Sequence, residues 1–290
     1  MKKTVRFLVA SAAFLIASIG VTSCSIGTVT SNNMMGGMNY NEQDLQEKPF
    51  KAIDVQVLAD VYYTQNNRDE CKVRLDYSAI EDADFAQKLK ENVKVVYRDG
   101  EVKIGCKEKI NVPGSYNAEG KRLKIYITST DIVKITQEGV GSFHAKDINT
   151  DKLTVDNEGV GSVYMTKILA NRLEVVNEGV GSVRIDEVTG DNMNIDNEGV
   201  GSVNVKKVTM GNLTVDNEGV GSVTLDSFKG GSLKVVNEGV GKVSAHVDCK
   251  SVTASLEGVG GIKLSGSAQY YTRNRDGIGK ISDRDLEVGK

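Results

Sequence analysis

A four-residue motif, Glu-Gly-Val-Gly, recurs along the second half of the chain and constrains its fold more than any other feature. Six copies follow one another at 20-residue intervals, beginning at Glu138, Glu158, Glu178, Glu198, Glu218 and Glu238. Two looser copies begin at Glu257 and Asp276, each after a 19-residue interval. A nearly fixed period of this length is typical of a protein in which each repeat forms one structural unit.

Each repeat contains two short runs in which apolar and polar residues alternate. In residues 151–170, Leu153 and Val155 alternate with polar residues before the glycines, and Val163 and Met165 do so after them. Such alternation indicates β-strands rather than helices. Two strands of roughly 17 Å and two bends use up one repeat, so the chain returns to the same place one strand further along. We therefore predict an all-β fold, a parallel β-helix or β-solenoid with about 20 residues per coil.

The paired glycines are predicted to form a tight corner between two sheets, because glycine adopts positive φ angles without a steric clash. The predicted corner residues are Gly139, Gly141, Gly159, Gly161, Gly179, Gly181, Gly199, Gly201, Gly219, Gly221, Gly239, Gly241, Gly258, Gly260, Gly277 and Gly279. The opposite corner is wider and carries one apolar residue in phase, which we expect to close the core. These residues are Ile148, Ile168, Val188, Val208 and Phe228.

One asparagine per repeat shares the phase of the inward apolar residues. The asparagines are Asn157, Asn177, Asn197, Asn217 and Asn237. Amides stacked at this spacing can hydrogen-bond along a column. We expect a buried asparagine ladder that supports the corner rather than binding a ligand.

The first residues resemble a bacterial lipoprotein signal. Lys2, Lys3 and Arg6 precede an apolar stretch that is short for a membrane span and that ends at Cys24. We predict a signal peptide over residues 1–23, lipidation of Cys24 and a flexible tether over residues 24–48. A plain secretory signal with an incidental cysteine is the alternative. No acidic residue lies between Cys24 and Glu42, which favours the periplasmic side of the outer membrane over the cell surface.

Residues 49–122 have a different pattern and are predicted to cap the solenoid, which would run over residues 123–282 with a tail at 283–290. Alternating runs predict several strands, and Asp99 with Gly100 is a strong hairpin signal. A short helix is expected from about Ile80 to Asn92, with a capping box at Ser78 and Glu81. Residues 107–121 read as a polar loop.

These features together resemble the head GIN family of auto-transporter adhesins. The resemblance rests on the opening Phe50-Lys51-Ala52-Ile53-Asp54-Val55, the strand Val61-Tyr62-Tyr63-Thr64-Gln65, the helix and hairpin, and the repeated Gly-x-Gly turns. It covers roughly residues 50–282. It implies a right-handed β-helix that is lipid-anchored or secreted, and it supplies no catalytic residues.

The residues show no pattern of an enzyme active site. The two histidines, His144 and His246, fall at different phases of the repeat, and motifs of serine hydrolases and zinc proteases are absent from the sequence. We therefore predict a chain that is not an enzyme. Cys71 and Cys106 both lie in the cap and could form a disulfide outside the cytoplasm, whereas Cys249 is expected to be a buried thiol.

The motif glutamates form a predicted column of like charges. Neighbours such as Glu158, Glu178, Glu198, Glu218 and Glu238 would lie about 4.8 Å apart. One interpretation is that they turn to solvent or accept hydrogen bonds from the corner amides. The alternative is a ladder of Ca²⁺ sites between neighbouring carboxylates, the one cofactor that the sequence raises.

The predicted function is a binding or adhesion module of the cell envelope that presents its surface to a glycan, a lipid or a protein. A structural spacer or assembly subunit is the alternative function, and a carbohydrate-active enzyme is the third. The sequence is also compatible with a homo-oligomer. We expect Tyr164 to have no stacked partner, because its counterparts are Arg184, Asn204, Thr224 and Ser244, and this weakens the glycan version. The formal net charge of −3 and the lack of a basic patch with interleaved aromatics argue against nucleic acid.

Overall fold

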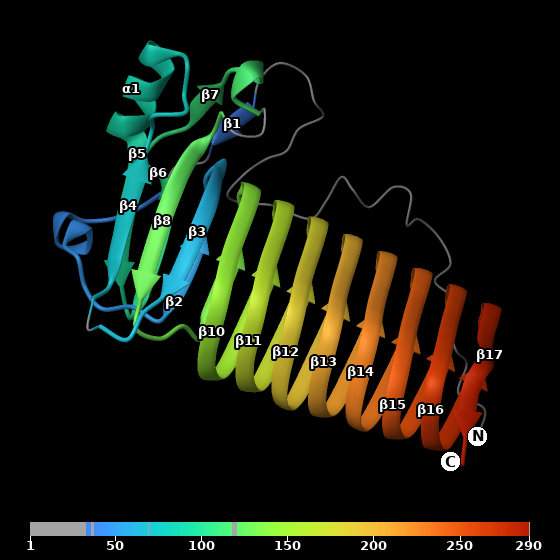
Figure 1. Cartoon of the computed structure of the whole chain (residues 1–290). Helices are drawn as coiled ribbons and strands as arrows, with labels where there is room; N and C mark the ends of the chain where they lie inside the picture. Colours follow the sequence, from blue (N-terminus) through green and yellow to red (C-terminus); the bar gives the residue numbers. More distant parts are fainter. Residues whose placement is uncertain (1–32, 36–37, 69, 118–120, 290) are drawn as a thin grey trace, which may run out of the picture.

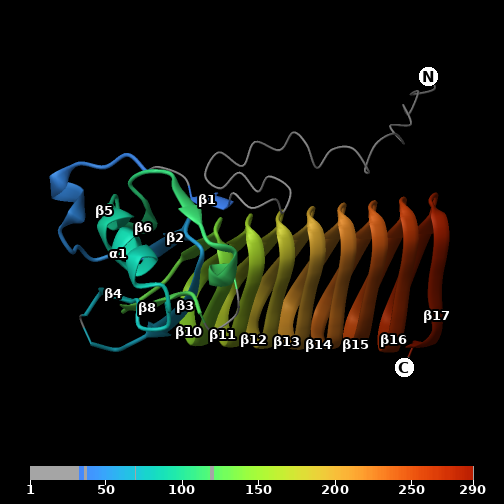
Figure 2. The ribbon, with the colours of Figure 1, turned by 90° about the horizontal axis from the view of Figure 1, so that it is seen from above.

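The computed structural model describes residues 33–35, 38–68, 70–117 and 121–289 of the chain. A row of β-coils extends from a cap of shorter strands and one helix, as Figure 1 shows from the side and Figure 2 from above. The predicted cap and repeat region are thus both present. No helix in this described part is long and apolar enough to cross a membrane.

The coils stack in parallel and in register. Val160 pairs with Val180, and Asn177 pairs with Asn197, so that each residue lies beside its counterpart 20 residues on. The predicted β-solenoid is therefore confirmed. Its coils are β10 (Val140–Asn157), β11 (Val160–Asn177), β12 (Val180–Asn197), β13 (Val200–Asn217), β14 (Val220–Asn237), β15 (Val240–Leu256), β16 (Val259–Arg275) and β17 (Ile278–Val288).

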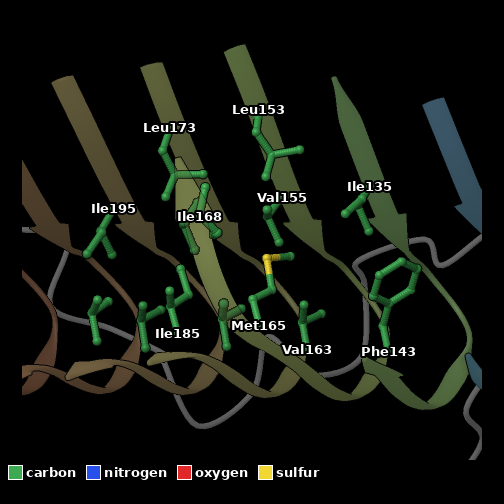
Figure 3. Close-up of a cluster of buried hydrophobic side chains, with 14 of the residues drawn as sticks. Ile135, Phe143, Leu153, Val155, Val163, Met165, Ile168, Leu173, Ile185 and Ile195 are labelled. Carbon is green, nitrogen blue, oxygen red and sulfur yellow. The ribbon is translucent and has the colours of Figure 1, made fainter. Parts of the chain in front are cut away.

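Each long strand bends at the wide corner, so its first half joins one sheet and its second half another. The core fills the space between them, as Figure 3 shows for Val163, Met165 and Leu173. These side chains are at most 2% exposed. The wide-corner residues Ile168 and Phe228 are fully buried, which confirms that they close the core.

The strands of the cap continue both sheets instead of forming a separate layer. They are β2 (Ala52–Val55), β3 (Ala59–Gln65), β4 (Lys72–Asp76), β5 (Val93–Arg98), β6 (Glu101–Cys106), β8 (Leu123–Ser129) and β9 (Lys134–Gln137). In the first sheet the spatial order is β4, β8, β3, β10, because β3 pairs in parallel with both β8 and β10. In the second sheet β2 lies between β6 and β9. A strand from early in the chain thus lies between β8 and the first complete coil.

The helix and the hairpin of the cap lie close to where the sequence places them. The helix α1 (Ala83–Asn92) begins at Asp82, whose side chain accepts a hydrogen bond from the Phe85 amide at 2.9 Å. The expected capping box at Ser78 and Glu81 is therefore wrong by one turn. Asp99 and Gly100 connect β5 and β6 with φ angles of 53° and 78°, which suit a two-residue hairpin turn.

Part of the predicted tether is ordered against the cap. The strand β1 (Asn33–Met35) pairs with β7 (Ile110–Val112), and the Met38 amide donates to the Cys106 carbonyl. A short 3-10 helix, η2 (Glu42–Leu45), follows, and its Asp44 forms an ion pair with Arg98. The prediction of a flexible tether is therefore wrong for residues 38–48. The predicted polar loop likewise contains β7 and a second 3-10 helix, η3 (Gly114–Asn117).

Candidate functional site

The Gly-Val-Gly corner is built on close contact between neighbouring coils. A Cβ atom on Gly199 would lie 2.2 Å from the carbonyl oxygen of Gly179, and one on Gly201 would lie 1.8 Å from that of Gly181. Of the sixteen corner glycines only Gly141 and Gly260 have φ angles in the left-handed region, at 138° and 159°. The expectation that positive φ explains the glycines is therefore wrong at most positions, because the lack of space above each glycine explains them instead.

The valine between the glycines points outward. Val180, Val200, Val220 and Val240 are 40–50% exposed and follow one another along the corner. The repeated valine therefore forms an apolar ridge along the solenoid.

The asparagine ladder is present as predicted. Each side-chain amide donates to the next along the column at 2.7 Å, from Asn157 through Asn177, Asn197 and Asn217 to Asn237. All five side chains are fully buried. Because every internal member both donates and accepts, the ladder holds the second sheet in register at the corner.

Replacing Asn197 with leucine is expected to destabilise the chain by roughly 2–5 kcal/mol. The change removes the acceptor of Asn177 and the donor to Asn217, and each orphaned buried group costs about 1–3 kcal/mol. Urea unfolding followed by circular dichroism measures the loss. Asn204→Leu is the matched control, because Asn204 is half-exposed on the outer face and donates only to the Ser202 hydroxyl, at 3.0 Å. An equal loss in both variants would contradict a special role for the ladder.

The corner amides do not need the motif glutamates. The amides of Glu178 and Gly179 both donate to the Asn157 carbonyl, at 3.1 and 2.8 Å, and the Val180 amide donates to Gly159 at 3.0 Å. The interpretation that the glutamate side chains accept these hydrogen bonds is therefore wrong. The exposed Glu178 and Glu198 side chains instead face solvent.

Aspartates beside the glutamates make this edge of the second sheet strongly acidic. Burial raises the pKa of Asp196 to about 6, helped by the nearby carboxylates of Asp216 and Glu174. Burial and the neighbouring Asp156 also raise the pKa of Glu158. Within the described ranges, no group of three or more metal-binding side chains is positioned to hold an ion. The Ca²⁺ ladder stays a hypothesis.

The solenoid is expected to be more stable at pH 5 than at pH 8. A carboxyl group whose pKa is raised on folding adds stability that is present below its unfolded pKa, near 4, and is lost as the pH rises through about 6. Asp196→Asn should therefore raise the melting temperature at pH 8 and reduce the difference between the two pH values. After allowance for solvent screening, the effect is roughly 1 kcal/mol or less. Scanning calorimetry measures it, and Asp226→Asn on the first sheet, which removes the same charge elsewhere, should leave the pH dependence unchanged.

An aromatic column crosses the outer surface of the first sheet where the cap meets the coils. It consists of Tyr126 on β8, Tyr62 on β3, His144 on β10 and Tyr164 on β11. Successive rings are nearly parallel, with interplanar angles of 21°, 11° and 14° and centroids 5.4, 5.1 and 5.1 Å apart. Arg74 on β4 extends the column, since its guanidinium carbon lies 4.1 Å from the Tyr126 centroid. The expectation that Tyr164 has no stacked partner is therefore wrong.

The first sheet positions this column through strand register. Tyr62 pairs with both Tyr126 and His144, and His144 pairs with Tyr164. Each of these residues lies between two inward side chains, so all four rings project from the same face. Tyr164 is 38% exposed, and the other three side chains are half-buried. The column is an accessible aromatic surface on an otherwise polar face.

A serine, a histidine and an aspartate meet beside the column. The Ser142 hydroxyl donates to Asp60 at 2.9 Å, and the His144 Nε2 atom lies 3.0 Å from the same hydroxyl. Arg122 forms an ion pair with Asp60 at 3.3 Å. In a hydrolase triad the histidine stands between the other two residues and takes the serine proton. Here the serine stands in the middle and donates its hydroxyl hydrogen bond to the carboxylate, so the group orients His144 within the column.

The sequence of residues 49–227 matches the family described as "Putative auto-transporter adhesin, head GIN domain". The chain belongs to this head GIN domain family. The resemblance indicated by its motifs is thereby confirmed. Among curated proteins, no significant match to the chain is found.

Several solved structures are similar to the chain in fold. A putative adhesin from Bacteroides fragilis is 22% identical and has a TM-score of 0.57, over 81% of this chain and 92% of its own. A putative lipid binding protein from Parabacteroides distasonis is 16% identical with a TM-score of 0.62, over 82% and 93% of the two chains. A putative adhesin from the same species is 16% identical with a TM-score of 0.57, over 83% and 93%. At these identities the likeness shows a shared fold.

The cysteines of this head GIN chain lie apart from the aromatic column. Cys71 is half-exposed just before β4, and Cys106 is buried at the end of β6. Their pairing stays a prediction that non-reducing peptide mapping can test. Cys249 is 9% exposed, and burial raises its pKa to about 11, which fits an inert thiol. Cys24 lies outside the described residues.

Proposed function

We propose that this head GIN protein is a non-catalytic binding module of the cell envelope, and that the first sheet carries its binding surface. The observation that carries the proposal is the aromatic column, because tyrosines gathered on an exposed face are typical of recognition surfaces. The names of the family and of its structural relatives, adhesins and a lipid binding protein, point in the same direction.

The rigidity of the solenoid supports this role. The column spans strands that are fixed by in-register pairing, so its rings are held in place before a ligand arrives. Pre-organised side chains lose little conformational entropy on binding. The serine–aspartate–histidine group beside the column lacks the proton path of a hydrolase, which favours binding over turnover.

Surface plasmon resonance tests the proposal. The purified chain would be passed over the polysaccharide, lipid and protein fractions of a bacterial envelope and of an epithelial cell surface. Saturable binding to one fraction, without release of cleaved ligand, is expected. The proposal would be contradicted if none of the six fractions bound saturably, or if a fraction were cleaved over time.

We also propose that Cys24 anchors the protein to a membrane through a lipid, with the periplasmic side of the outer membrane as the favoured address. Changing Cys24 to serine should move the protein from the membrane fraction to the soluble fraction and abolish metabolic labelling with palmitate. Fractionation and labelling of the two forms measure this. A mutant that still sediments with membranes, beside a wild type that incorporates no label, would contradict the anchor.

A further inference from the structure

We propose that the aromatic column and the two polar columns beside it bind an acidic polysaccharide. The inference rests on the proposed binding function and assigns its ligand class. The polar columns lie two residues to either side of the rings on the same strands. Asp60, Ser142 and Ser162 form one of them, and Thr128, Thr64 and Lys146 form the other.

The charge of this face favours an anion. The acidic side chains nearest the column already have cationic partners: Asp60 pairs with Arg122, Asp76 with Arg74 at 3.6 Å, and Asp186 with Lys206 at 2.7 Å. Among the described residues, Lys72, Lys124, Lys146 and Arg184 of this face form no ion pair. Four cations without a partner therefore surround the aromatic column, while the acidic edge lies on the second sheet.

The positions of these cations follow the column. Lys72 pairs with Thr128 at the β4 edge, and Lys124 pairs with Asp60 one strand further in. Arg184 on β12 pairs with Tyr164 at the other end of the column. From Arg74 to Arg184 the column crosses six strands, which is about 24 Å at the usual strand spacing. That length suits a chain of several sugar rings with carboxylate or sulfate groups along it.

The way the rings stack favours a polysaccharide over nucleic acid. Each inner ring has both faces against its neighbours, with centroids no more than 5.4 Å apart. A base inserted between two rings would need roughly twice the ~3.4 Å base rise, so stacking of bases along the column is blocked. What remains accessible are ring edges and hydroxyl groups. The Tyr126 and Tyr164 hydroxyls make no hydrogen bond to another residue in the described ranges and are suited to sugar hydroxyls and carboxylates.

The polar columns supply further hydrogen-bonding groups of the same kind. Ser162 and Ser182 exchange a hydrogen bond at 3.0 Å and lie half-exposed beside Tyr164. Thr64 and Thr166 are exposed on the other side. A ligand lying on the rings would thus meet hydroxyl groups on both flanks.

Affinity electrophoresis and calorimetry with defined polymers test the assignment. The probes are polygalacturonate, alginate, hyaluronate and chondroitin sulfate, with fully methyl-esterified pectin as the uncharged match of polygalacturonate. A thymidine oligonucleotide and phosphatidylglycerol vesicles represent the other anionic classes. All measurements contain EDTA, so that metal-bridged association is excluded. We expect binding to at least one acidic polysaccharide, weakening with salt, and none to the methyl ester.

Variants on the folded surface locate the site. Tyr164→Ala and the double variant Lys72→Gln with Lys146→Gln should each lower the affinity by about 3- to 10-fold, as expected for losing one or two polar contacts. Thr224→Ala lies in the same outward column three coils beyond Tyr164 and should bind like the wild type. Circular dichroism and melting curves confirm that the variants are folded.

The outcomes separate this inference from the proposed binding function. Three results would overturn the assignment of an acidic polysaccharide as the ligand. These are equal binding to the methyl ester, tighter binding to the oligonucleotide or the vesicles, and an unchanged affinity in all the variants of this surface. Failure of all four acidic polymers to bind would overturn it as well. If envelope fractions are still bound in that case, the binding module stands with another ligand; if they are not bound either, both proposals fall.

Discussion

Replacing Gly199 with alanine is expected to destabilise the solenoid by about 3–5 kcal/mol. The new Cβ atom would lie 2.2 Å from the Gly179 carbonyl oxygen and 2.5 Å from backbone atoms of Glu178. Overpacking normally costs ~1–3 kcal/mol, but here the atoms it meets are backbone atoms that are fixed by the coil below. Thermal and urea unfolding would measure this large loss in the free energy of unfolding, which is caused by adding one methyl group.

Gly114→Ala in the cap is the matched control, because a Cβ atom there meets nothing within 4 Å. Its free energy of unfolding should stay within about 0.5 kcal/mol of the wild type. A Gly199 variant as stable as this control would show that the coils are further apart at the corner than the structure places them.

Phe228→Ala is expected to cost about 3–5 kcal/mol. Phe228 is fully buried at the wide corner and pairs with Val208 and Val247, which are smaller. Its ring takes the space beside Gly230, where an added Cβ atom would lie 2.9 Å from the ring. The coil thus combines a large residue with a small one, and truncating the large one leaves a cavity that valine neighbours cannot fill.

The exposed Val220→Ala in the same coil serves as the control, with an expected loss below about 1 kcal/mol. The double variant Phe228→Val with Gly230→Ala is not expected to recover the loss, since the added Cβ would lie 1.8 Å from the Met210 carbonyl oxygen. Equal losses for Phe228→Ala and Val220→Ala would place the ring outside the core.

The repeat could be read from the sequence because a solenoid is built from contacts between identical positions. The 20-residue period, the inward phase of Val163 or Phe228 and the asparagine ladder all follow from local alternation and its repetition. The reason why the corner positions require glycine did not follow from this alternation. The sequence shows that glycine is required at Gly199, but only the distance between coils distinguishes a left-handed φ angle from a lack of space.

The aromatic column could not be found from the repeat alone. His144 and Tyr164 lie 20 residues apart, but Tyr62 and Tyr126 come from the cap, and their phase depends on which strands become neighbours. The one signal available was that Tyr62 and Tyr126 each lie between two apolar residues, in the outward phase that His144 and Tyr164 share. The insertion of β3 between β8 and the first coil turns these separate tyrosines into one surface.

The motif glutamates show a similar limit. Their constant phase predicts a column, which the structure contains, but it does not reveal that the corner amides already bond to the preceding coil. Backbone satisfaction depends on the vertical offset between coils, which leaves no trace in side-chain periodicity. The glutamates therefore remain exposed acids. Neighbouring carboxyl groups whose pKa is raised, such as that of Asp196, make the edge sensitive to pH.

Protection of His144 from diethyl pyrocarbonate is the most direct test of the claim that the chain binds through its aromatic column. The sequence contains two histidines, and His246 lies on the exposed surface of β15, far along the solenoid from the column. Both would be modified with and without the envelope fraction or polysaccharide that the chain binds, and the extent of modification at each would be measured by mass spectrometry. We expect the ligand to slow modification of His144 and to leave that of His246 unchanged; equal rates at His144 with and without a saturating ligand would contradict binding through the column.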